Sequence, residues 1–510
     1  MGKVFGHLKR IIAPAIAAAL FLFPIIGKAA DLQVSLAVLP FANTSGDVGE
    51  DAFADGISDE IGAALSQVLD LHVGARTSAF RFKGEADTAK IGTALSRNYL
   101  LQGTVRKTGD NLSLSARLVR ASDGASLWSK DYDGKLAGFF DMEEDIAKNV
   151  AATLRVPTGL GNGDKLVKDR TANMAAYEKY VRAKPLIRAR GLKAFADARV
   201  LLEEAVAADP NFVPALAMLA FDYDLTPLYA PVLRAGPIEE AKTLVDGVIP
   251  KAQTLSQHAV QLNPFRSDSY VALAYALMVQ GHLMQADIVF RQALALDPNN
   301  TDGMHGYSQL LAAMGQVKEA IRMREKLQAL EPFVTNYVAD TAEIIWLDPD
   351  YPMANETAIR MLNAFRPNRT MELAQVHASL GQYKEAAAVL REMNAGNYPP
   401  GVLEAAARLL ETAPAKTGDP QNLPRLSILG WTYLYVGATE RTMEYYETNL
   451  AAGYFQPIST TWFWHPSYRE LRKTERFRAF VKNIGLVEAW RRNGWPDFCH
   501  PLEDNDFACE

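Results

Sequence analysis

Residues 267–300 read "SDSYVALAYALMVQGHLMQADIVFRQALALDPNN", and they contain a pattern that recurs along the second half of the chain. Gly281 separates two runs in which apolar residues stand at helical spacing. Ala286 follows five positions later, and Pro298 closes the second run. We therefore expect two helices joined by a tight turn, with the proline ending the second helix because it lacks an amide donor.

The same residue types return in register along the chain. They are Pro264, Pro298 and Pro332, Gly281 and Gly315, and Ala286, Ala320 and Ala386, with a spacing of 34 residues or close to a multiple of it. A turn glycine, a small residue and a closing proline at this period are the signature of the tetratricopeptide repeat (TPR), a pair of antiparallel helices. One such hairpin cannot bury its apolar face alone, so neighbouring hairpins must stack. The sequence predicts an all-α TPR solenoid over residues 173–459.

The repeats differ in length and quality. We place them near residues 179–212, 267–300, 301–334, 335–367, 368–400 and 423–456. The stretch 210–264 is longer than one period, which predicts a loop at 225–237 between two lengthened helices. The repeat that begins at 335 is degenerate, since "DPDYP" (348–352) replaces its turn glycine.

Residues 32–156 have a different pattern, typical of a mixed α/β domain. Val34 to Phe41 is apolar enough for a strand that is buried on both faces. The other expected strands cover residues 71–75, 99–106, 112–119 and 127–132, and the expected helices cover 52–69, 88–96 and 139–154. Residues 157–172, which include "TGLGNGDK", read as a linker to the solenoid.

Several ordered blocks of this part resemble a known family. They are "AVLPFANTSGD" (37–47), "FADGISDEI" (53–61), "ARTSAFRFKG" (75–84) and "YLLQGTVRKTGDNLSLSARLVRASDGASLWSKDYD" (99–133). They are similar to the TolB amino-terminal-like domain, which several bacterial signalling proteins carry in front of TPRs. The resemblance implies a small α/β interaction domain without catalytic residues. In many relatives a cytoplasmic adenylate cyclase or winged-helix domain lies upstream across a membrane helix. Only the export segment precedes the first strand here, so we expect no cyclase activity.

The loop after the first strand raises the question of a phosphate or metal site. A phosphate cradle needs closely spaced glycines and usually a lysine, whereas this loop has Asp47, Glu50, Asp51 and Asp55. Carboxylates suit the positive end of the helix that follows. Their spacing lacks the alternation of a calcium loop. We predict a solvated acidic helix cap, with a metal site as the alternative.

The first thirty residues read as an export signal. Lys3, Lys9 and Arg10 precede an uncharged, mostly apolar run at 11–26, and small residues follow. We predict a signal peptide over residues 1–30, cut near Ala29 or Ala30. The alternative is an uncleaved anchor that associates with the membrane through residues 11–26, although this run is short for a span. Both place the protein in the periplasm or on the inner membrane facing the periplasm.

Composition limits the partners. The chain has 510 residues, 49% hydrophobic and 22% charged, with a net charge of −6 and no long basic run. This composition is ordinary for a globular protein and argues against a nucleic-acid binder, whose affinity depends on lysine and arginine. Cys499 and Cys509 are predicted to form a disulfide in an oxidising compartment, with two free thiols as the alternative. We predict no metal site and no cofactor.

Residues 460–510 combine four tryptophans with many arginines, and we predict a segment that caps the solenoid. The alternative is a catalytic or ligand cluster of His465, Asp497, Cys499 and His500. No G-x-S-x-G, H-E-x-x-H or complete S-x-x-K set occurs. We therefore predict that the protein is not an enzyme. An enzyme would need a clustered, buried set of titratable residues in one cleft.

Function is then expected from the concave groove, which the first helix of each hairpin lines in a TPR solenoid. The positions predicted to be exposed there are Tyr275, His305, Gln309, Asn336, Glu343, Gln375, Trp431 and Tyr435. These side chains suit an extended peptide or protein partner; the alternative is an ordinary polar face without a ligand. The leading hypothesis is an exported, non-enzymatic scaffold for protein–protein interaction. The second is a sensory module, derived from an adenylate-cyclase-type receptor lacking the catalytic domain, that binds a small molecule or peptide.

Overall fold

The computed structural model describes residues 34–159, 165–166, 170–364, 370–415, 419–455, 457–503 and 506–510. The predicted export signal lies outside the described residues, and so does part of the predicted linker. Within the described ranges, no helix combines the length and the apolar character needed to cross a membrane.

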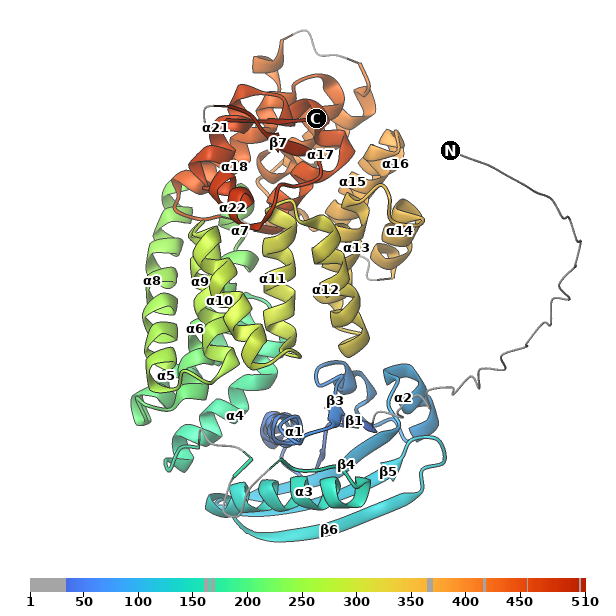
Figure 1. The fold of residues 1–510 in the computed structure, drawn as a ribbon, viewed down its shortest axis with the longest axis vertical. Coiled ribbons are helices and arrows are strands. Elements are labelled where there is room, and N and C mark those ends of the chain that lie inside the picture. Colours follow the sequence, from blue (N-terminus) through green and yellow to red (C-terminus); the bar gives the residue numbers. More distant parts are fainter. Residues whose placement is uncertain are drawn as a thin grey trace, which may run out of the picture. The chain divides into compact units, whose positions relative to one another are not determined.

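The first part of the chain is a mixed sheet with helices packed against both faces (Figure 1). Its strands are β1 (Val34–Val38), β2 (Ala42–Asn43), β3 (Leu71–Val73), β4 (Tyr99–Thr108), β5 (Asn111–Arg120) and β6 (Ser126–Lys135). Their order is β3-β1-β4-β5-β6, with β2 beside β4. β1 runs parallel to β3 and β4, whereas β4, β5 and β6 are antiparallel.

The helices of this part are η1 (Val48–Glu50), α1 (Asp51–Leu65), η2 (Ser78–Phe82), α2 (Thr88–Leu95), η3 (Leu136–Gly138) and α3 (Phe139–Leu154). Side chains of β1 and the residue after it alternate between two cores. Leu36 and Val38 join the core that contains α1 and α3, and Ala37 and Leu39 join the one that contains α2. Because both faces of β1 are covered, its sequence is largely apolar.

The second part is a run of helices that pack as antiparallel hairpins (Figure 1). They are α4 (Met174–Ala189), α5 (Leu192–Ala208), α6 (Val213–Tyr229), α7 (Pro231–Ala235), α8 (Ile238–Leu262), α9 (Ser267–Val279), α10 (Leu283–Leu296), α11 (Thr301–Ala313), α12 (Val317–Leu330), α13 (Thr335–Leu347), α14 (Ala354–Asn363), α15 (Thr370–Ser379), α16 (Tyr383–Arg391), η4 (Ala395–Asn397), α17 (Val402–Thr412), η5 (Pro420–Asn422), η6 (Ser427–Val436), η7 (Thr439–Thr442) and α18 (Met443–Ala451).

The residues that define the repeat have the expected environments. Gly281, Gly315 and Gly381 all have a positive φ, in the region that favours glycine. Ala286 and Ala320 are fully buried where the two helices of a hairpin pack together. The predicted fold class, an α/β domain followed by a TPR solenoid, is confirmed.

Two details differ from the prediction. The segment 225–237, expected as a loop, contains the end of α6 and the short helix α7; the helices beside it are lengthened as expected, since α8 alone has 25 residues. The first helix of the last hairpin is the 3-10 helix η6, not an α-helix.

The sheet part joins the solenoid through α1 and α4. At Gly56 of α1, an added Cβ would lie 2.2 Å from the carbonyl oxygen of Val181 on α4. Only glycine allows the two backbones to approach this closely. A second contact forms at η2, where Thr77 N and Ser78 N donate to the carboxylate of Glu331 over 3.0 and 2.8 Å.

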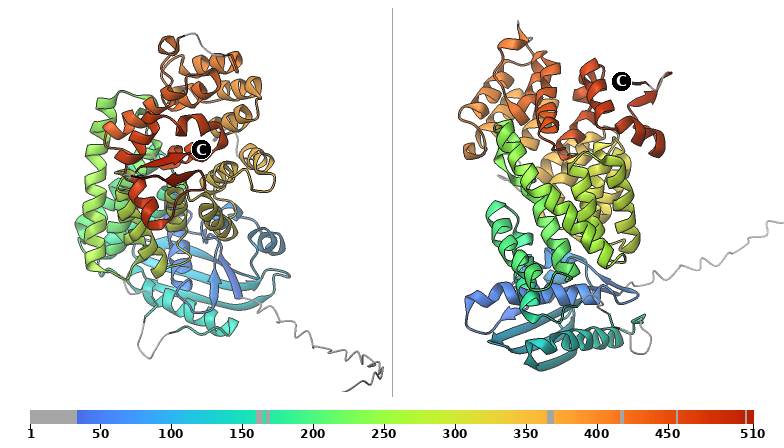
Figure 2. Two further views of the ribbon diagram at one scale, coloured as in Figure 1. Left: turned by 45° about the horizontal axis from the view of Figure 1, so that its top comes forward. Right: turned by 90° about the vertical axis from the view of Figure 1, so that its left-hand side faces the viewer.

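The chain ends in a segment that returns to the solenoid, which we call the C-terminal segment (residues 457–510). Its elements are α19 (Pro457–Thr460), η8 (Thr461–Trp464), η9 (Pro466–Tyr468), α20 (Arg469–Arg472), α21 (Glu475–Asn483), α22 (Leu486–Asn493), β7 (Cys499–Pro501) and β8 (Phe507–Cys509). Figure 2 shows this segment in red beside the hairpins of the solenoid. Cys499 and Cys509 form a disulfide that links β7 to β8.

Candidate functional site

The predicted groove residues all lie on the first helices of hairpins, but most of them are not exposed. Tyr275, Glu343, Gln375 and Trp431 are at most 2% exposed, whereas Asn336 and Tyr435 are half-buried. His305 and Gln309 are each 7% exposed. The prediction that these eight side chains are exposed is therefore wrong for six of them.

The C-terminal segment accounts for part of this burial. Trp462 Nε1 donates to the carboxylate of Glu343 on α13. Trp464 Nε1 donates to the carbonyl oxygen of Ala313 over 3.2 Å, and Trp490 Nε1 donates to that of Met314 over 2.7 Å. The segment thus packs on hairpins in the middle of the solenoid, and not only on the last repeat, where a cap was expected.

Two other groove residues, His305 and Gln309, belong to a buried polar network between α11, α12 and α13. Gln309 Nε2 donates to Asp340 Oδ2 over 2.9 Å, and Arg324 Nη1 lies 2.8 Å from His305 Nδ1. Arg324 has no solvent exposure, and burial lowers the pKa of its guanidinium while Asp340 opposes this shift. Since a buried charge needs such partners, His305 and Gln309 hold the hairpins together.

Three other groove residues, Tyr275, Trp431 and Tyr435, lie beside aromatic rings. Tyr275 packs between the rings of Phe221 and Phe290, at centroid distances of 5.2 and 5.5 Å. Trp431 and Tyr435 are neighbours, with centroids 6.2 Å apart. Gln375, although buried, finds no hydrogen-bond partner for its amide among the described residues. The eight residues therefore form no single open groove in the part of the chain that the structure describes.

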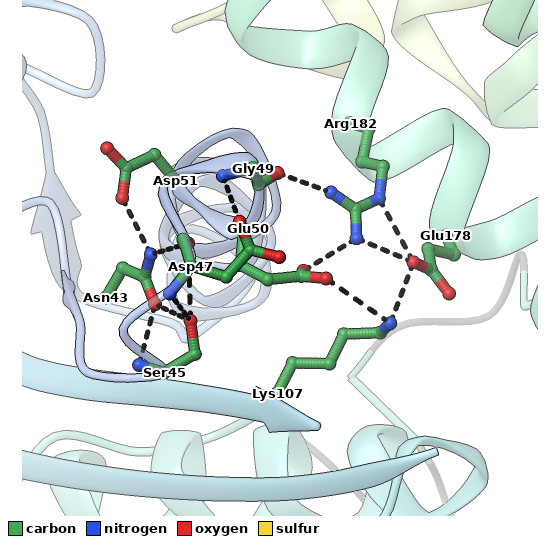
Figure 3. Close-up of polar contacts among 9 residues, drawn as sticks. All are labelled: Asn43, Ser45, Asp47, Gly49, Glu50, Asp51, Lys107, Glu178 and Arg182. Atoms are coloured by element: carbon green, nitrogen blue, oxygen red, sulfur yellow. Dashed lines mark hydrogen bonds and ion pairs between the residues drawn. The ribbon is translucent and has the colours of Figure 1, made fainter. Parts of the chain in front are cut away.

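The acidic loop before α1 is held by hydrogen bonds between its own residues (Figure 3). Ser45 N donates to Asn43 Oδ1 over 2.9 Å, Asp47 N donates to Ser45 Oγ over 3.1 Å, and Gly49 N donates to Asp47 Oδ1 over 2.8 Å. These amides bind the loop's own side chains, so they are not available to a phosphate. Asp47 caps η1, which precedes α1, and not α1 itself as expected.

Glu50 of the same loop contributes to an ion-pair network with the solenoid (Figure 3). Arg182 Nη2 of α4 lies 2.6 Å from Glu50 Oε2 and 2.8 Å from Glu178 Oε1. Lys107 of β4 lies 2.9 Å from the same Glu178 oxygen, and Arg182 Nη1 donates to the carbonyl oxygen of Gly49. This network connects the α/β part to the first solenoid helix. Among the described residues there is no group of three or more His, Cys, Asp or Glu able to hold a metal.

The alternative catalytic set in the C-terminal segment is dispersed over separate contacts. His465 stacks on Trp346 of α13, Asp497 lies 3.4 Å from Lys318, and Cys499 is in the disulfide. His500 is exposed on β7. Sequence reasoning missed the contact between the C-terminal segment and α13, for which the cluster of tryptophans was the available signal.

Two family models match the chain. Residues 32–148 match the model described as "HilA/YgeH-like transcriptional regulator, second domain", and residues 267–300 match a tetratricopeptide repeat model. The TPR prediction is thereby confirmed. The TolB-like resemblance is not confirmed, because the model that matches that region carries another description.

The chain is also similar to a curated protein, "Putative adenylate cyclase 3" of Rhizobium meliloti (strain 1021). The two are 28% identical over 254 residues, which cover 50% of this chain and 42% of that protein. The chain thus spans less than half the length of this curated relative.

Solved structures of TPR proteins resemble the solenoid. A thermophilic TPR protein of Thermus thermophilus is 18% identical to it, and the match covers 46% of this chain and 99% of that protein, with a TM-score of 0.26. YrrB, a "TPR protein with an unusual peptide-binding site", is 15% identical, and the match covers 40% of this chain and 92% of YrrB, with a TM-score of 0.26.

Proposed function

We propose that this protein is a non-enzymatic scaffold that binds a protein partner. TPR hairpins are interaction modules, and their stacking presents an extended surface. The observation that carries the proposal is that the solenoid already holds an irregular, aromatic-rich segment, its own C-terminal one. Trp462, Trp464 and Trp490 are anchored by indole hydrogen bonds to α13 and to the end of α11. A partner segment would use the same kinds of contact.

The C-terminal segment is proposed to stay in place while a partner binds. Its tryptophans Trp462, Trp464 and Trp490 are at most 2% exposed. Re-exposing a large buried apolar side chain costs about 1.5–3 kcal/mol or more, so displacing several at once would consume most of the binding energy of an ordinary partner. The partner surface is then the outside of the assembled solenoid and segment, and not the eight residues expected from the repeat.

Two exposed apolar side chains offer positions at which a partner can be captured. Phe265, between α8 and α9, is 81% exposed, and Met353, before α14, is 66% exposed. We suggest placing a photo-crosslinking amino acid at each of these positions in the full chain, with Lys193 on α5 as the control. Its side chain is 89% exposed but polar. A stoichiometric protein adduct in cell-envelope extracts from Phe265 or Met353, and not from Lys193, supports the scaffold; adducts from none of them contradict it.

The compartment belongs to the same proposal. An apolar run at 11–26 and a disulfide between Cys499 and Cys509 are both consistent with export to the periplasm or anchoring on the inner membrane. Sequencing the amino terminus of the mature protein tests this. A start near residue 30 supports cleavage, and an intact start in the membrane fraction supports the anchor. A chain that stays in the cytoplasm contradicts both.

A second candidate function is a sensory or regulatory module in cyclase-type signalling. The similarity to a protein named as a putative adenylate cyclase favours it. The TolB-like resemblance of residues 34–156 stays a prediction and would fit the same role. A small metabolite that raises the melting temperature of the full chain, when no protein adduct forms, would favour this candidate over the scaffold.

A further inference from the structure

A pocket of about 390 Å³ lies between the degenerate hairpin and the C-terminal segment. Its walls include Trp346 at the end of α13, Tyr351 in the following turn, Asn355 at the start of α14, and His465 from the C-terminal segment. This volume is in the range of small-molecule sites. The groove prediction does not include it, and the scaffold proposal shares with it only Met353, which is also in its lining.

The unusual turn of the degenerate repeat forms part of the pocket wall. The corresponding turns of other hairpins, such as 280–282 and 314–316, are short and contain a glycine with positive φ. The turn at 348–353 is longer, because "DPDYP" replaces the glycine. Met353 ends it in the left-handed conformation at φ 54°, which is strained for a residue with a side chain. Three residues of this longer turn, Pro349, Tyr351 and Met353, line the pocket.

His465 contributes a hydrogen-bond donor to this pocket. Ser467 N donates to His465 Nδ1 over 3.1 Å, so Nδ1 must be an acceptor and the ring proton of the neutral histidine is on Nε2. His465 is only 8% exposed and lies flat on Trp346, with ring centroids 3.9 Å apart. No hydrogen bond to Nε2 forms among the residues that the structure describes. A donor on a largely buried side chain that lines a pocket and has no protein acceptor among the described residues points to a ligand.

The first turn of α14 contributes donors of a second kind. Ala354, Asn355 and Glu356 all line the pocket, and no described side chain caps this helix end. The Ala354 amide donates to the carbonyl oxygen of Tyr351 over 3.1 Å, which leaves the amides of Asn355 and Glu356. Amides of a first helical turn have no acceptor within the helix, and the helix dipole makes this end favourable for negative charge. Ser379, also in the wall, is already used, because its hydroxyl accepts from Trp346 Nε1.

We propose that this pocket binds a carboxylate carried on a small, flat, apolar group. The amides of Asn355 and Glu356 and His465 Nε2 would donate to the carboxylate. Tyr351, Pro349 and Pro466 would contact the apolar part. Glu356 lies on the rim as an exposed acid, and it opposes a second negative charge. A singly charged carboxylate therefore fits better than a phosphate. Such a group occurs in free organic acids and at the carboxyl end of a peptide.

Binding of simple probes to the full chain tests the proposal. The probes are benzoate for a free acid and N-acetylphenylalanine for a peptide end, each measured by calorimetry against its neutral amide. Binding of an acid with at least tenfold preference over its amide supports the carboxylate. Benzoate alone identifies a free-acid site, and N-acetylphenylalanine alone identifies a peptide-end site. If neither acid binds, or if the amides bind equally well, the proposal is wrong.

Variants locate the site. N355D places a negative charge among the donors while suiting a helix start, and we expect the dissociation constant of the acid to rise at least tenfold. H465F keeps the flat ring but removes the donor, and should weaken binding about tenfold. E356Q removes the rim charge and should strengthen binding. Glu385 is the third residue of α16, as Glu356 is of α14, but it follows a tight glycine turn, so E385Q is the matched control. Equal affinity in wild type, N355D and H465F would overturn the assignment.

Discussion

The imidazole of His465 lies against the indole of Trp346, with ring centroids 3.9 Å apart and an interplanar angle of 17°. His465 belongs to the C-terminal segment and Trp346 to α13, and their contact is one of the points at which the segment packs against the solenoid. Burial, with a smaller contribution from Arg472, lowers the pKa of His465 to about 3. The stack therefore depends on a neutral ring.

We predict that acid weakens this contact and so lowers the free energy of unfolding. The folded-state pKa of His465 lies below the unfolded value of about 6.5, so its contribution to stability is complete above that value. It is lost as the pH falls toward 3, by up to ~1.4 kcal/mol per pH unit. In H465F the free energy of unfolding should fall less between about pH 7 and about pH 5. Urea unfolding followed by tryptophan fluorescence measures this difference.

Exposed His500 provides the control for that experiment. H500Q should have the same pH dependence as the wild type. If H465F and the wild type lose equal stability on acidification, the stack does not require a neutral histidine.

A second prediction concerns the α1–α4 crossing. G56A adds a Cβ that would lie 2.2 Å from the carbonyl oxygen of Val181, so the helices must separate. We expect a loss of about 2–4 kcal/mol, as for other overpacked contacts. Gly247 of α8 is the matched control, since nothing lies within 4 Å of an added Cβ there. G247A should stabilise the protein by about 0.5–1 kcal/mol through helix propensity. Thermal unfolding of the two variants gives the comparison, and equal effects would contradict a close crossing.

Much of the fold is predictable because its determinants are local and periodic. The glycine turns and the buried alanines each follow from one hairpin, and stacking repeats them. Gly281 and Gly315 therefore have the positive φ that a tight turn requires, and Ala286 is buried as predicted. The strands and helices of the α/β part follow from equally local patterns, so that α3 occupies the expected residues 139–154.

The candidate site is less predictable, because it depends on contacts distant in sequence. The carboxylate of Glu343 accepts a hydrogen bond from Trp462, a residue 119 positions further along the chain. Repeat periodicity assigns Glu343 to the first helix of its hairpin but contains no information about a non-repeating segment that covers it. Likewise "DPDYP" is recognisable as a broken repeat, whereas the pocket beside it is also lined by His465, which is distant in sequence.

A third prediction tests the ion pairs between the α/β part and the solenoid. Arg182 contacts both Glu50 and Glu178, so R182E would gather three carboxylates and should lower the stability by about 1–2 kcal/mol. The double variant R182E/E50R should recover part of this loss, with a coupling energy of about 0.5–1 kcal/mol for such partly exposed groups. R182M, which removes the charge and keeps the stem, is the control. A cycle of urea unfolding experiments without measurable coupling would show that the network does not join the two parts.

The last prediction concerns Asp224, which is fully buried in α6 and has no hydrogen-bond partner for either carboxylate oxygen among the described residues. Burial, aided by Asp222, raises its pKa well above the ordinary value. Because the folded-state pKa is the higher one, the contribution to stability is complete below the unfolded pKa of about 3.9 and is lost as the pH rises toward the folded value.

Replacing Asp224 should therefore stabilise the protein at neutral pH. D224L removes the unpaired oxygens, and we expect a gain of about 1–3 kcal/mol in the free energy of unfolding. D224N keeps a buried polar group but abolishes its titration, so it should flatten the fall in stability with rising pH. Burial also raises the pKa of Asp222, to about 6. Asp222 therefore adds its own fall in stability with rising pH, and this fall remains in D224N. D246N, at an exposed ion pair with Lys242, is the control and should leave the profile unchanged. Unfolding in urea across this pH range measures both effects, and a loss of stability in D224L would mean that Asp224 has a partner and is required for folding.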